Sequence, residues 1–125
     1  MKRTDSEVLS IAVKAFLGDY LPHQRACSAH TILSYRDSLK LFLQFAAGTK
    51  RKITALTVEH LSPQIVTAFL DHLESKRRNG AATRNVRLTA IHSFFDYLGR
   101  EYPEHLLHAL LSQPDGVSLR INTLI

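Results

Sequence analysis

Apolar residues recur at intervals of three and four along most of this chain, and no stretch shows the strict alternation of a half-buried β-strand. One such run follows Ser28 and places six apolar side chains on one helical face: Ile32, Tyr35, Leu39, Phe42, Leu43 and Ala46. A chain with this period in every segment buries its apolar residues by packing helices against helices. We therefore predict an all-α fold, a compact bundle of four main helices with short connections.

Residues that favour helix ends divide the chain into its predicted helices. Ser28 and Ser62 are predicted N-caps, and Pro63 suits the first position of a helix. Pro22 is predicted to end the first helix and Gly99 the fourth. The predicted helices are 5–21, 28–47 (ended by Gly48), 62–78, 81–98 and a short fifth segment, 103–113, with a connector at 49–60.

The composition indicates one globular domain with a basic surface. At 125 residues the chain is long enough for a single modest core. Its 16 Lys and Arg residues exceed its 11 Asp and Glu residues, and the formal charge of +5 favours a polyanionic partner. The single cysteine excludes an intrachain disulfide. The sequence contains neither a signal-peptide core nor an apolar run that could span a bilayer, so we expect a cytoplasmic protein without membrane contact.

Catalytic and cofactor-binding motifs are missing from the sequence, which has no phosphate-binding loop, dinucleotide fingerprint or nucleophile elbow. Among seven histidines, His105 and His108 could share a helix face, and His60 could approach His72. Neither pair belongs to a complete set of zinc ligands, so we interpret these histidines as surface residues. The chain is predicted to have no catalytic residue, no metal site and no small-molecule cofactor, and not to be an enzyme on its own.

The stretch KRRNGAATRNVRLTAIHSFFDYL, residues 76–98, concentrates cationic side chains before its first acidic residue, Asp96. Cations are unfavourable in the first turns of a helix, where backbone N–H groups already carry partial positive charge. A phosphate at the helix start would stabilise the cationic side chains and the backbone N–H groups, because N–H groups and guanidinium groups can bind one phosphate together. The candidate phosphate contacts are Arg77, Arg78, Thr83, Arg84 and Arg87. A solvated basic turn explains the charge equally well.

The start of the helix predicted from Ser28 is a second candidate surface. Hydroxyl groups and N-terminal amides commonly contact DNA phosphates without reading bases. The candidate residues here are Ser28, His30, Thr31, Ser34 and, further along, Lys40. Ser28 also fits the simpler role of an N-cap, and Tyr35 lies on the apolar stripe, where core packing is the favoured role.

Three stretches, TILSYRDSLKLFLQFA, LSPQIVTAFLDHLE and AATRNVRLTAIHSFFDYL, together resemble the N-terminal core-binding domain of tyrosine recombinases, the phage-integrase family. The resemblance covers roughly residues 6–111 and implies a SAM-like four-helix domain that forms half of a C-shaped clamp on duplex DNA. It implies DNA contacts at both candidate surfaces. At the start of the helix that begins at Ser28, these contacts are Ser28, His30, Thr31 and Ser34. On the outward face of the 81–98 helix, they are Thr83, Arg84, Arg87, Thr89 and His92. In the family, an Arg or Lys usually stands at the position of His92.

The family's catalytic residues have no counterpart in this chain. In the family, a C-terminal domain supplies an Arg, a Lys, a His-x-x-Arg box, a further His or Trp, and a tyrosine that attacks a DNA phosphate. No His-x-x-Arg occurs here, and the four tyrosines lie within the predicted helical domain. We expect a DNA-binding domain at 1–112 and a linker or frayed tail at 113–125, in a chain that is either a fragment or the product of a truncated recombinase gene.

Two functions of different classes fit these observations. The favoured hypothesis is the binding of double-stranded DNA at a recombination site, as the N-terminal clamp domain of a site-specific recombinase. The alternative is a helical protein–protein module that pairs with, or interferes with, full-length recombinase protomers. Leu41 and Phe45 lie outside the apolar stripe of their helix and could serve such a contact, although burial under the first helix is the favoured explanation for them.

Overall fold

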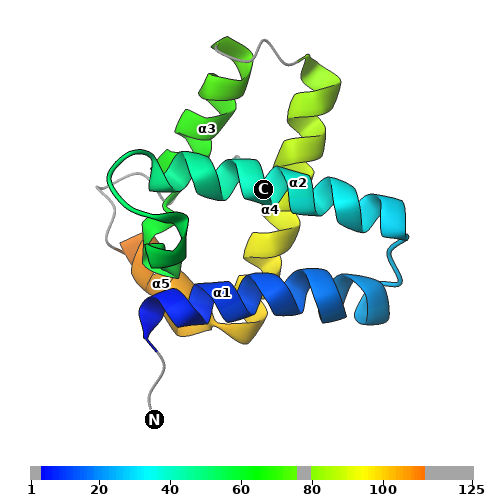
Figure 1. Ribbon diagram of the computed structural model, residues 1–125, viewed down its shortest axis with the longest axis horizontal. Helices are drawn as coiled ribbons and strands as arrows, with labels where there is room; N and C mark the ends of the chain where they lie inside the picture. The colour runs from blue at the N-terminus through cyan, green and yellow to red at the C-terminus, as the bar shows by residue number, and fades with distance from the viewer. Residues whose placement is uncertain (1–3, 76–79, 112–125) are drawn as a thin grey trace.

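The computed structural model describes residues 4–75 and 80–111, and these residues form helices with no strand among them (Figure 1). The α-helices of the described chain are α1 (Asp5–Ala15), α2 (Ala29–Ala47), α3 (Pro63–Ser75), α4 (Ala81–Glu101) and α5 (Pro103–Leu111). A π-helical segment, η1 (Phe16–Gln24), continues α1, and two short 3-10 turns, η2 (Ile53–Ala55) and η3 (Val58–His60), lie between α2 and α3. The predicted all-α bundle and its short fifth helix are confirmed.

The helix α2 lies across the middle of the molecule, as Figure 1 shows. It crosses α4, so that the first half of α4 stands beside α3 on one side of α2. The second half of α4 lies with α1 and α5 on the other side. The start of α2 lies at one end of the molecule, and the start of α1, with α5 beside it, lies toward the other end. This crossing of α2 and α4 positions the candidate site.

Several helix ends are formed by the residues that predicted them. The Oγ of Ser28 accepts a hydrogen bond from the N–H of Thr31 at 3.2 Å, which satisfies one of the free donors at the start of α2. The Oγ of Ser62 accepts one from the N–H of Ile65 at 3.3 Å, and α3 begins at the proline that follows Ser62. Gly48 ends α2 with a φ of 58°, a conformation that favours glycine. The predicted boundaries at these points are confirmed.

The prediction that Pro22 ends the first helix is wrong. Helical structure continues through Pro22 as η1, and the N–H of Arg25 donates to the carbonyl of Tyr20 at 3.0 Å. A π-helical turn is wider than an α-helical turn, which moves the preceding carbonyl away from the proline ring. Tyr20 and Leu21 are buried at 5% and 2% exposure, and this burial offsets the N–H group that proline lacks.

The prediction that Gly99 ends the fourth helix is also wrong, because α4 runs on to Glu101. A glycine inside a helix costs only about 1 kcal/mol relative to alanine. The next residue compensates for that cost: Arg100 donates a hydrogen bond to the hydroxyl of Tyr20, and its guanidinium lies 4.9 Å from the centroid of the same ring.

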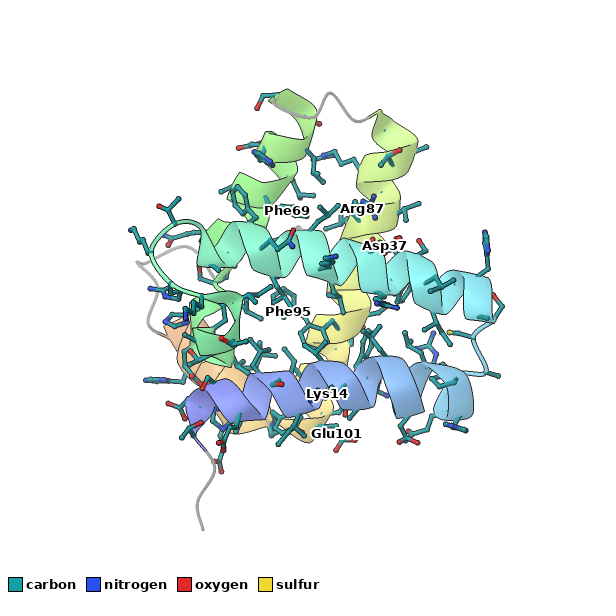
Figure 2. The ribbon with its side chains drawn as sticks, in the orientation of Figure 1. Lys14, Asp37, Phe69, Arg87, Phe95 and Glu101 are labelled. Atoms are coloured by element: carbon teal, nitrogen blue, oxygen red, sulfur yellow. The ribbon has the colours of Figure 1, made fainter. Side chains whose placement is uncertain are left out.

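Four phenylalanines form the centre of the core, one from each of η1, α2, α3 and α4: Phe16, Phe42, Phe69 and Phe94. Edge-to-face packing joins Phe16 to Phe94, with 5.2 Å between ring centroids, and Phe42 to Phe69, with 5.4 Å (Phe69 is labelled in Figure 2). Each pair joins two helices that are distant in sequence. The aromatic core therefore fixes how the helices around α2 and α4 are placed.

The connector predicted at 49–60 contains the two short turns η2 and η3. Leu56, which follows η2, and Val58 in η3 are buried at 1% and 0% exposure, so this part of the connector packs onto the core. The helix α5 packs against η3. The connector thereby gives α5 a fixed place next to the start of α1.

Candidate nucleic-acid interface

The start of α2 presents two hydroxyl groups, those of Ser28 and Thr31, which are hydrogen-bonded to each other. Besides capping the helix, the Oγ of Ser28 donates to the Oγ1 of Thr31 at 3.0 Å. His30, between them, is exposed, and Ser34 is half-buried one turn further along. These four residues from the sequence prediction therefore lie together at one helix start.

The start of α4 carries no acidic group and no side-chain cap. Gly80, at the N-cap position, is extended, with φ −71° and ψ 171°, and has no side chain to accept from the first backbone N–H groups. No acidic residue occupies the first turn, and Thr83 is exposed there. Free N–H groups give a helix start a partial positive charge. An anion would therefore be stabilised at this point.

Arg84 points toward α3, so the prediction that it lies on the outward face of its helix is wrong. Its Nε lies 3.1 Å from the Oε1 of Glu74, in an ion pair without hydrogen-bond geometry. Arg84 stands four residues before Leu88 and seven before Ile91, and this spacing places all three on one helical face. The same spacing is the signal in the sequence that indicates the inward direction, because Ile91 is buried.

Arg87 is also directed inward, toward α2 (Figure 2), which corrects the same prediction. Its Nη1 donates to the Oγ of Ser38 at 3.0 Å, and Ser38 donates in turn to the carbonyl of Ser34 at 2.9 Å. Ser38 is fully buried and was not among the predicted site residues. The signal for it is modest, a polar residue at the edge of the apolar stripe of α2. Through Ser38, the two candidate surfaces are bonded to each other.

The remaining predicted residues of α2 and α4 differ in how accessible they are. Lys40 and Thr89 are exposed, and the hydroxyl of Thr89 donates to the carbonyl of Asn85 at 2.8 Å. His92 is half-buried, and its Nε2 is buried without a hydrogen-bond partner in the described part of the chain. Burial lowers the pKa of His92, and the carboxylate of Asp96 opposes this only in part. His92 is therefore uncharged at neutral pH.

Four further predicted residues do not add to this surface. Arg77 and Arg78 lie outside the described residues. Leu41 and Phe45 are half-buried and pack against the core. The ring of Phe45 lies 5.5 Å from that of Phe69, so α3 covers Phe45, and not the first helix as predicted. The apolar contact surface suggested for the alternative function is therefore part of the core packing.

The comparisons with known proteins agree with this fold. Residues 13–102, well over half of the chain, match the family model described as phage integrase, N-terminal SAM-like domain. The chain belongs to this family. The match concerns the N-terminal SAM-like domain of the integrases and not their catalytic domain. The family resemblance and the SAM-like fold inferred from the sequence are thereby confirmed.

Curated relatives carry the names of recombinases. The chain is 43% identical over 98 residues to "Putative integrase/recombinase y4rC" and 40% identical over 97 residues to "Putative integrase/recombinase y4rD", both of Sinorhizobium fredii (strain NBRC 101917 / NGR234). It is 35% identical over 103 residues to "Tyrosine recombinase XerC" of Rhodospirillum centenum (strain ATCC 51521 / SW). The alignments take in 77–78% of this chain and 29–34% of the relatives, so the chain spans about a third of their length.

No solved structure matches the chain. Within the described residues, no helix combines the length and the apolar character needed to cross a membrane.

Proposed function

We propose that this domain binds double-stranded DNA through the starts of α2 and α4, as the N-terminal half of the clamp of a tyrosine recombinase. The observation that carries the proposal is the start of α4, where a helix with no side-chain cap and no acidic first turn is followed by Arg84 and Arg87. A DNA phosphate would satisfy the N–H groups, the helix dipole and the guanidinium groups together. Membership of the integrase family supports the proposal.

Both arginines keep their charge available to a phosphate. The ion pair of Arg84 with Glu74 has side chains that are 35% and 55% exposed, so exchanging Glu74 for a phosphate oxygen costs about 1 kcal/mol or less. Arg87 is held by the neutral hydroxyl of Ser38, which orients the guanidinium group without cancelling its charge. DNA binding would therefore require Arg84 to exchange Glu74 for a phosphate oxygen, whereas Arg87 would keep its bond to Ser38.

The start of α2 would supply neutral contacts beside these charges. Hydroxyl and imidazole groups there are at the surface, and the Arg87–Ser38–Ser34 bonds hold α2 against α4. The proposed contact residues are Ser28, His30, Thr31, Ser34, Lys40, Thr83, Arg84, Arg87 and Thr89. Arg77 and Arg78 stay predictions from the sequence, and His92 is left out as a cationic contact because it is uncharged at neutral pH.

We propose further that these 125 residues bind DNA but do not cleave it. The family match concerns the N-terminal domain, and the sequence lacks a His-x-x-Arg box. In this proposal the DNA-binding domain is 1–112, residues 113–125 are a linker or tail, and the partners are a recombination site in the cytoplasm and other recombinase protomers. The alternative, a helical module that pairs with or interferes with full-length recombinase, stays a prediction, but Leu41 and Phe45 do not support it because they pack against the core.

Fluorescence anisotropy with a labelled duplex of random sequence, over about 50 to 200 mM salt, tests the proposal. The logarithm of the wild-type binding constant should fall steeply as salt rises. The double variant Arg84→Ala, Arg87→Ala should bind all sequences more weakly and lower the salt slope by up to about two.

Lys14→Ala is the matched control, because it removes one cationic side chain from an exposed position on α1 (Figure 2). Its binding and salt slope should stay at wild-type values. A double variant that binds DNA as well as Lys14→Ala does would exclude the start of α4 from the interface.

A further inference from the structure

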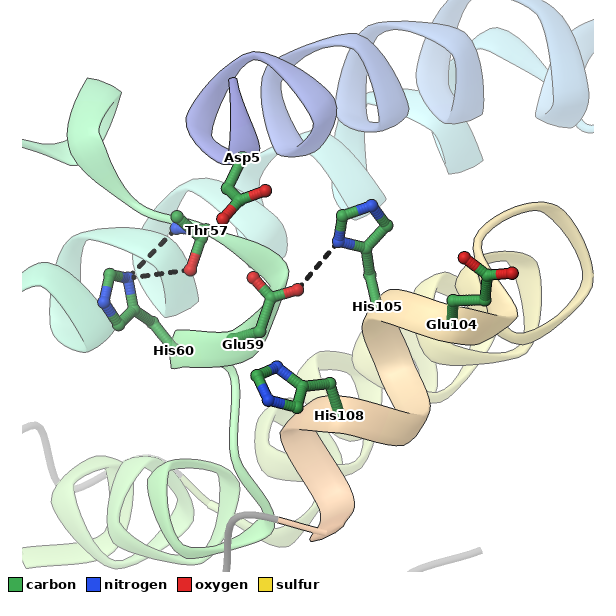
Figure 3. Close-up of a pocket in the computed structure, with 7 residues that line it drawn as sticks. All are labelled: Asp5, Thr57, Glu59, His60, Glu104, His105 and His108. Carbon is green, nitrogen blue, oxygen red and sulfur yellow. Dashed lines mark hydrogen bonds and ion pairs between the residues drawn. The ribbon is translucent and has the colours of Figure 1, made fainter. Parts of the chain in front are cut away.

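A second polar site lies at the end of the bundle opposite the start of α2, where the start of α1, η3 and α5 meet (Figures 1 and 3). These segments surround an open cavity of about 520 Å³. Among the described residues, the lining contains three carboxylates, three imidazoles and one hydroxyl, and no lysine or arginine. In a chain with a formal charge of +5, this cavity gathers groups that attract a cation.

Three of these side chains converge on one point: Asp5 at the start of α1, Glu59 in η3 and His105 in α5 (Figure 3). One ligand atom from each lies within 4.8 Å of those from the other two. The Oε1 of Glu59 and the Nδ1 of His105 are 2.8 Å apart. The three residues are far apart in sequence, so the fold and not local structure brings them together.

We propose that Asp5, Glu59 and His105 bind a divalent transition-metal ion, and that Zn²⁺ fits them best. One imidazole nitrogen with two carboxylate oxygens is a donor set for Zn²⁺, whereas Mg²⁺ and Ca²⁺ prefer oxygen ligands alone. Tetrahedral Zn²⁺, with bonds of about 2.0 to 2.1 Å, holds its ligands about 3.4 Å apart. Side-chain movements of less than about 1 Å would bring the three ligand atoms to that separation.

Binding of the ion replaces the hydrogen bond between His105 and Glu59. The Nδ1 of His105 lies 2.8 Å from the Oε1 of Glu59, and the ion would bind Nδ1 on the side that now faces this carboxylate. Zn²⁺ binds the lone pair of Nδ1, a proton displaced from that nitrogen passes to Nε2 of the same ring or to solvent water, and water fills the remaining coordination position. The ion then joins α1, η3 and α5. Because the unfolded chain does not hold these ligands together, binding stabilises the folded domain.

Calorimetric titration of the full chain with ZnCl₂ tests this site, together with thermal unfolding in ZnCl₂ or in the same concentration of MgCl₂. We expect one Zn²⁺ per chain and a higher unfolding temperature with Zn²⁺ than with Mg²⁺. Glu59→Gln and His105→Gln should each weaken Zn²⁺ binding by at least about tenfold, the loss already typical of outer-shell partners. His105→Gln keeps a hydrogen-bond donor toward Glu59, and Asp5→Asn alters an exposed position, so these variants test the site even if Glu59→Gln is unstable.

Matched controls remove the same kinds of group elsewhere. His23→Gln and Glu101→Gln alter exposed side chains away from the cavity, and Cys27→Ser removes the thiol; all three should bind Zn²⁺ as the wild type does. Equal Zn²⁺ affinity of the wild type and His105→Gln, or equal effects of Zn²⁺ and Mg²⁺, would overturn the proposal in favour of a plain acidic surface. The variants of the metal site should bind DNA normally, so either proposal can fail without the other.

Discussion

Replacing Ser38 by alanine removes the bond between α2 and α4 beneath the proposed interface without altering a surface residue. The change deletes a hydroxyl that accepts from the Nη1 of Arg87 at 3.0 Å and donates to the carbonyl of Ser34 at 2.9 Å. The bond to Ser34 lies within one helix and matters less. The bond from the charged guanidinium matters more, because Ser38 is fully buried and the Nε of Arg87 already has no hydrogen-bond partner in the described chain.

The size of the effect follows from this bond. A hydrogen bond to a charged group contributes about 1.5 to 3 kcal/mol, so Ser38→Ala should lower the free energy of unfolding by about that amount. Arg87→Ala should cost slightly less, because Ser38 then keeps its bond to Ser34. The double variant should be little worse than Ser38→Ala, which gives a coupling energy of about 1.5 to 3 kcal/mol. Urea unfolding followed by circular dichroism measures all four proteins.

The same four proteins show whether the bond serves DNA binding. If Ser38 orients Arg87 toward a phosphate, Ser38→Ala should weaken DNA binding in the wild type and have no effect when Arg87 is already alanine. A coupling energy of unfolding below about 0.5 kcal/mol, within the error of additive effects, would refute the bond. Equal loss of DNA affinity in both backgrounds would refute the orienting role.

Two further predictions concern single positions. The pKa of His92 is lowered in the folded state, so as the pH falls the unfolded chain takes up the proton at a higher pH than the folded chain does. The contribution of His92 to stability is therefore complete above about pH 6.5, the ordinary pKa of histidine, and decreases as the pH falls below that value. His92→Gln should lose less unfolding free energy than the wild type between pH 7.5 and 5.5; equal losses would contradict the burial of His92. Gly99→Ala should stabilise α4 by up to about 1 kcal/mol, because the added Cβ would meet Leu106 at an ordinary contact distance of 3.5 Å. Gly48→Ala should instead destabilise the folded domain by about 1 kcal/mol, because alanine rarely adopts the φ of 58° found there. Thermal unfolding should move in opposite directions for the two glycine variants, and shifts in one direction would count against these assignments.

Local signals predicted most of the helix starts, because capping depends on residues close in sequence. Ser28 and Ser62 accept from N–H groups three residues ahead, and their own positions are enough to predict this. Local preference fails to predict the structure at Pro22 and Gly99, because tertiary packing outweighs it there. Tyr20, whose ring is buried and bonded to Arg100, lies behind both corrections.

The candidate site was predicted in part. The charge pattern indicates that residues near the start of α4 are cationic, but not where their side chains point. Arg84 and Arg87 turn toward partners on α3 and α2, and no local pattern names Glu74 or Ser38 as those partners. The helical spacing of Arg84 from Leu88 does indicate its direction, so that part was available from the sequence.

The ligand set in the cavity beside α5 could not be predicted from the sequence, for a different reason. The spacing of His105 and His108 indicates a shared helix face, but it does not indicate which carboxylates lie beside them. Asp5 and Glu59 meet His105 only through the packing of three separate segments. A ligand set of this kind becomes visible when the fold is known.

The contacts of η1 with α4 have a consequence for how the domain is made. Phe16 packs against Phe94, and Tyr20 binds Arg100, 80 residues further along the chain. During translation, α1 and η1 leave the ribosome long before these partners are synthesised. The apolar face of η1 therefore stays uncovered by its native partner, and accessible to chaperones and to other nascent chains, until α4 emerges. A nascent chain that ends before Phe94 lacks the aromatic partner of Phe16 on α4 and cannot complete the native core.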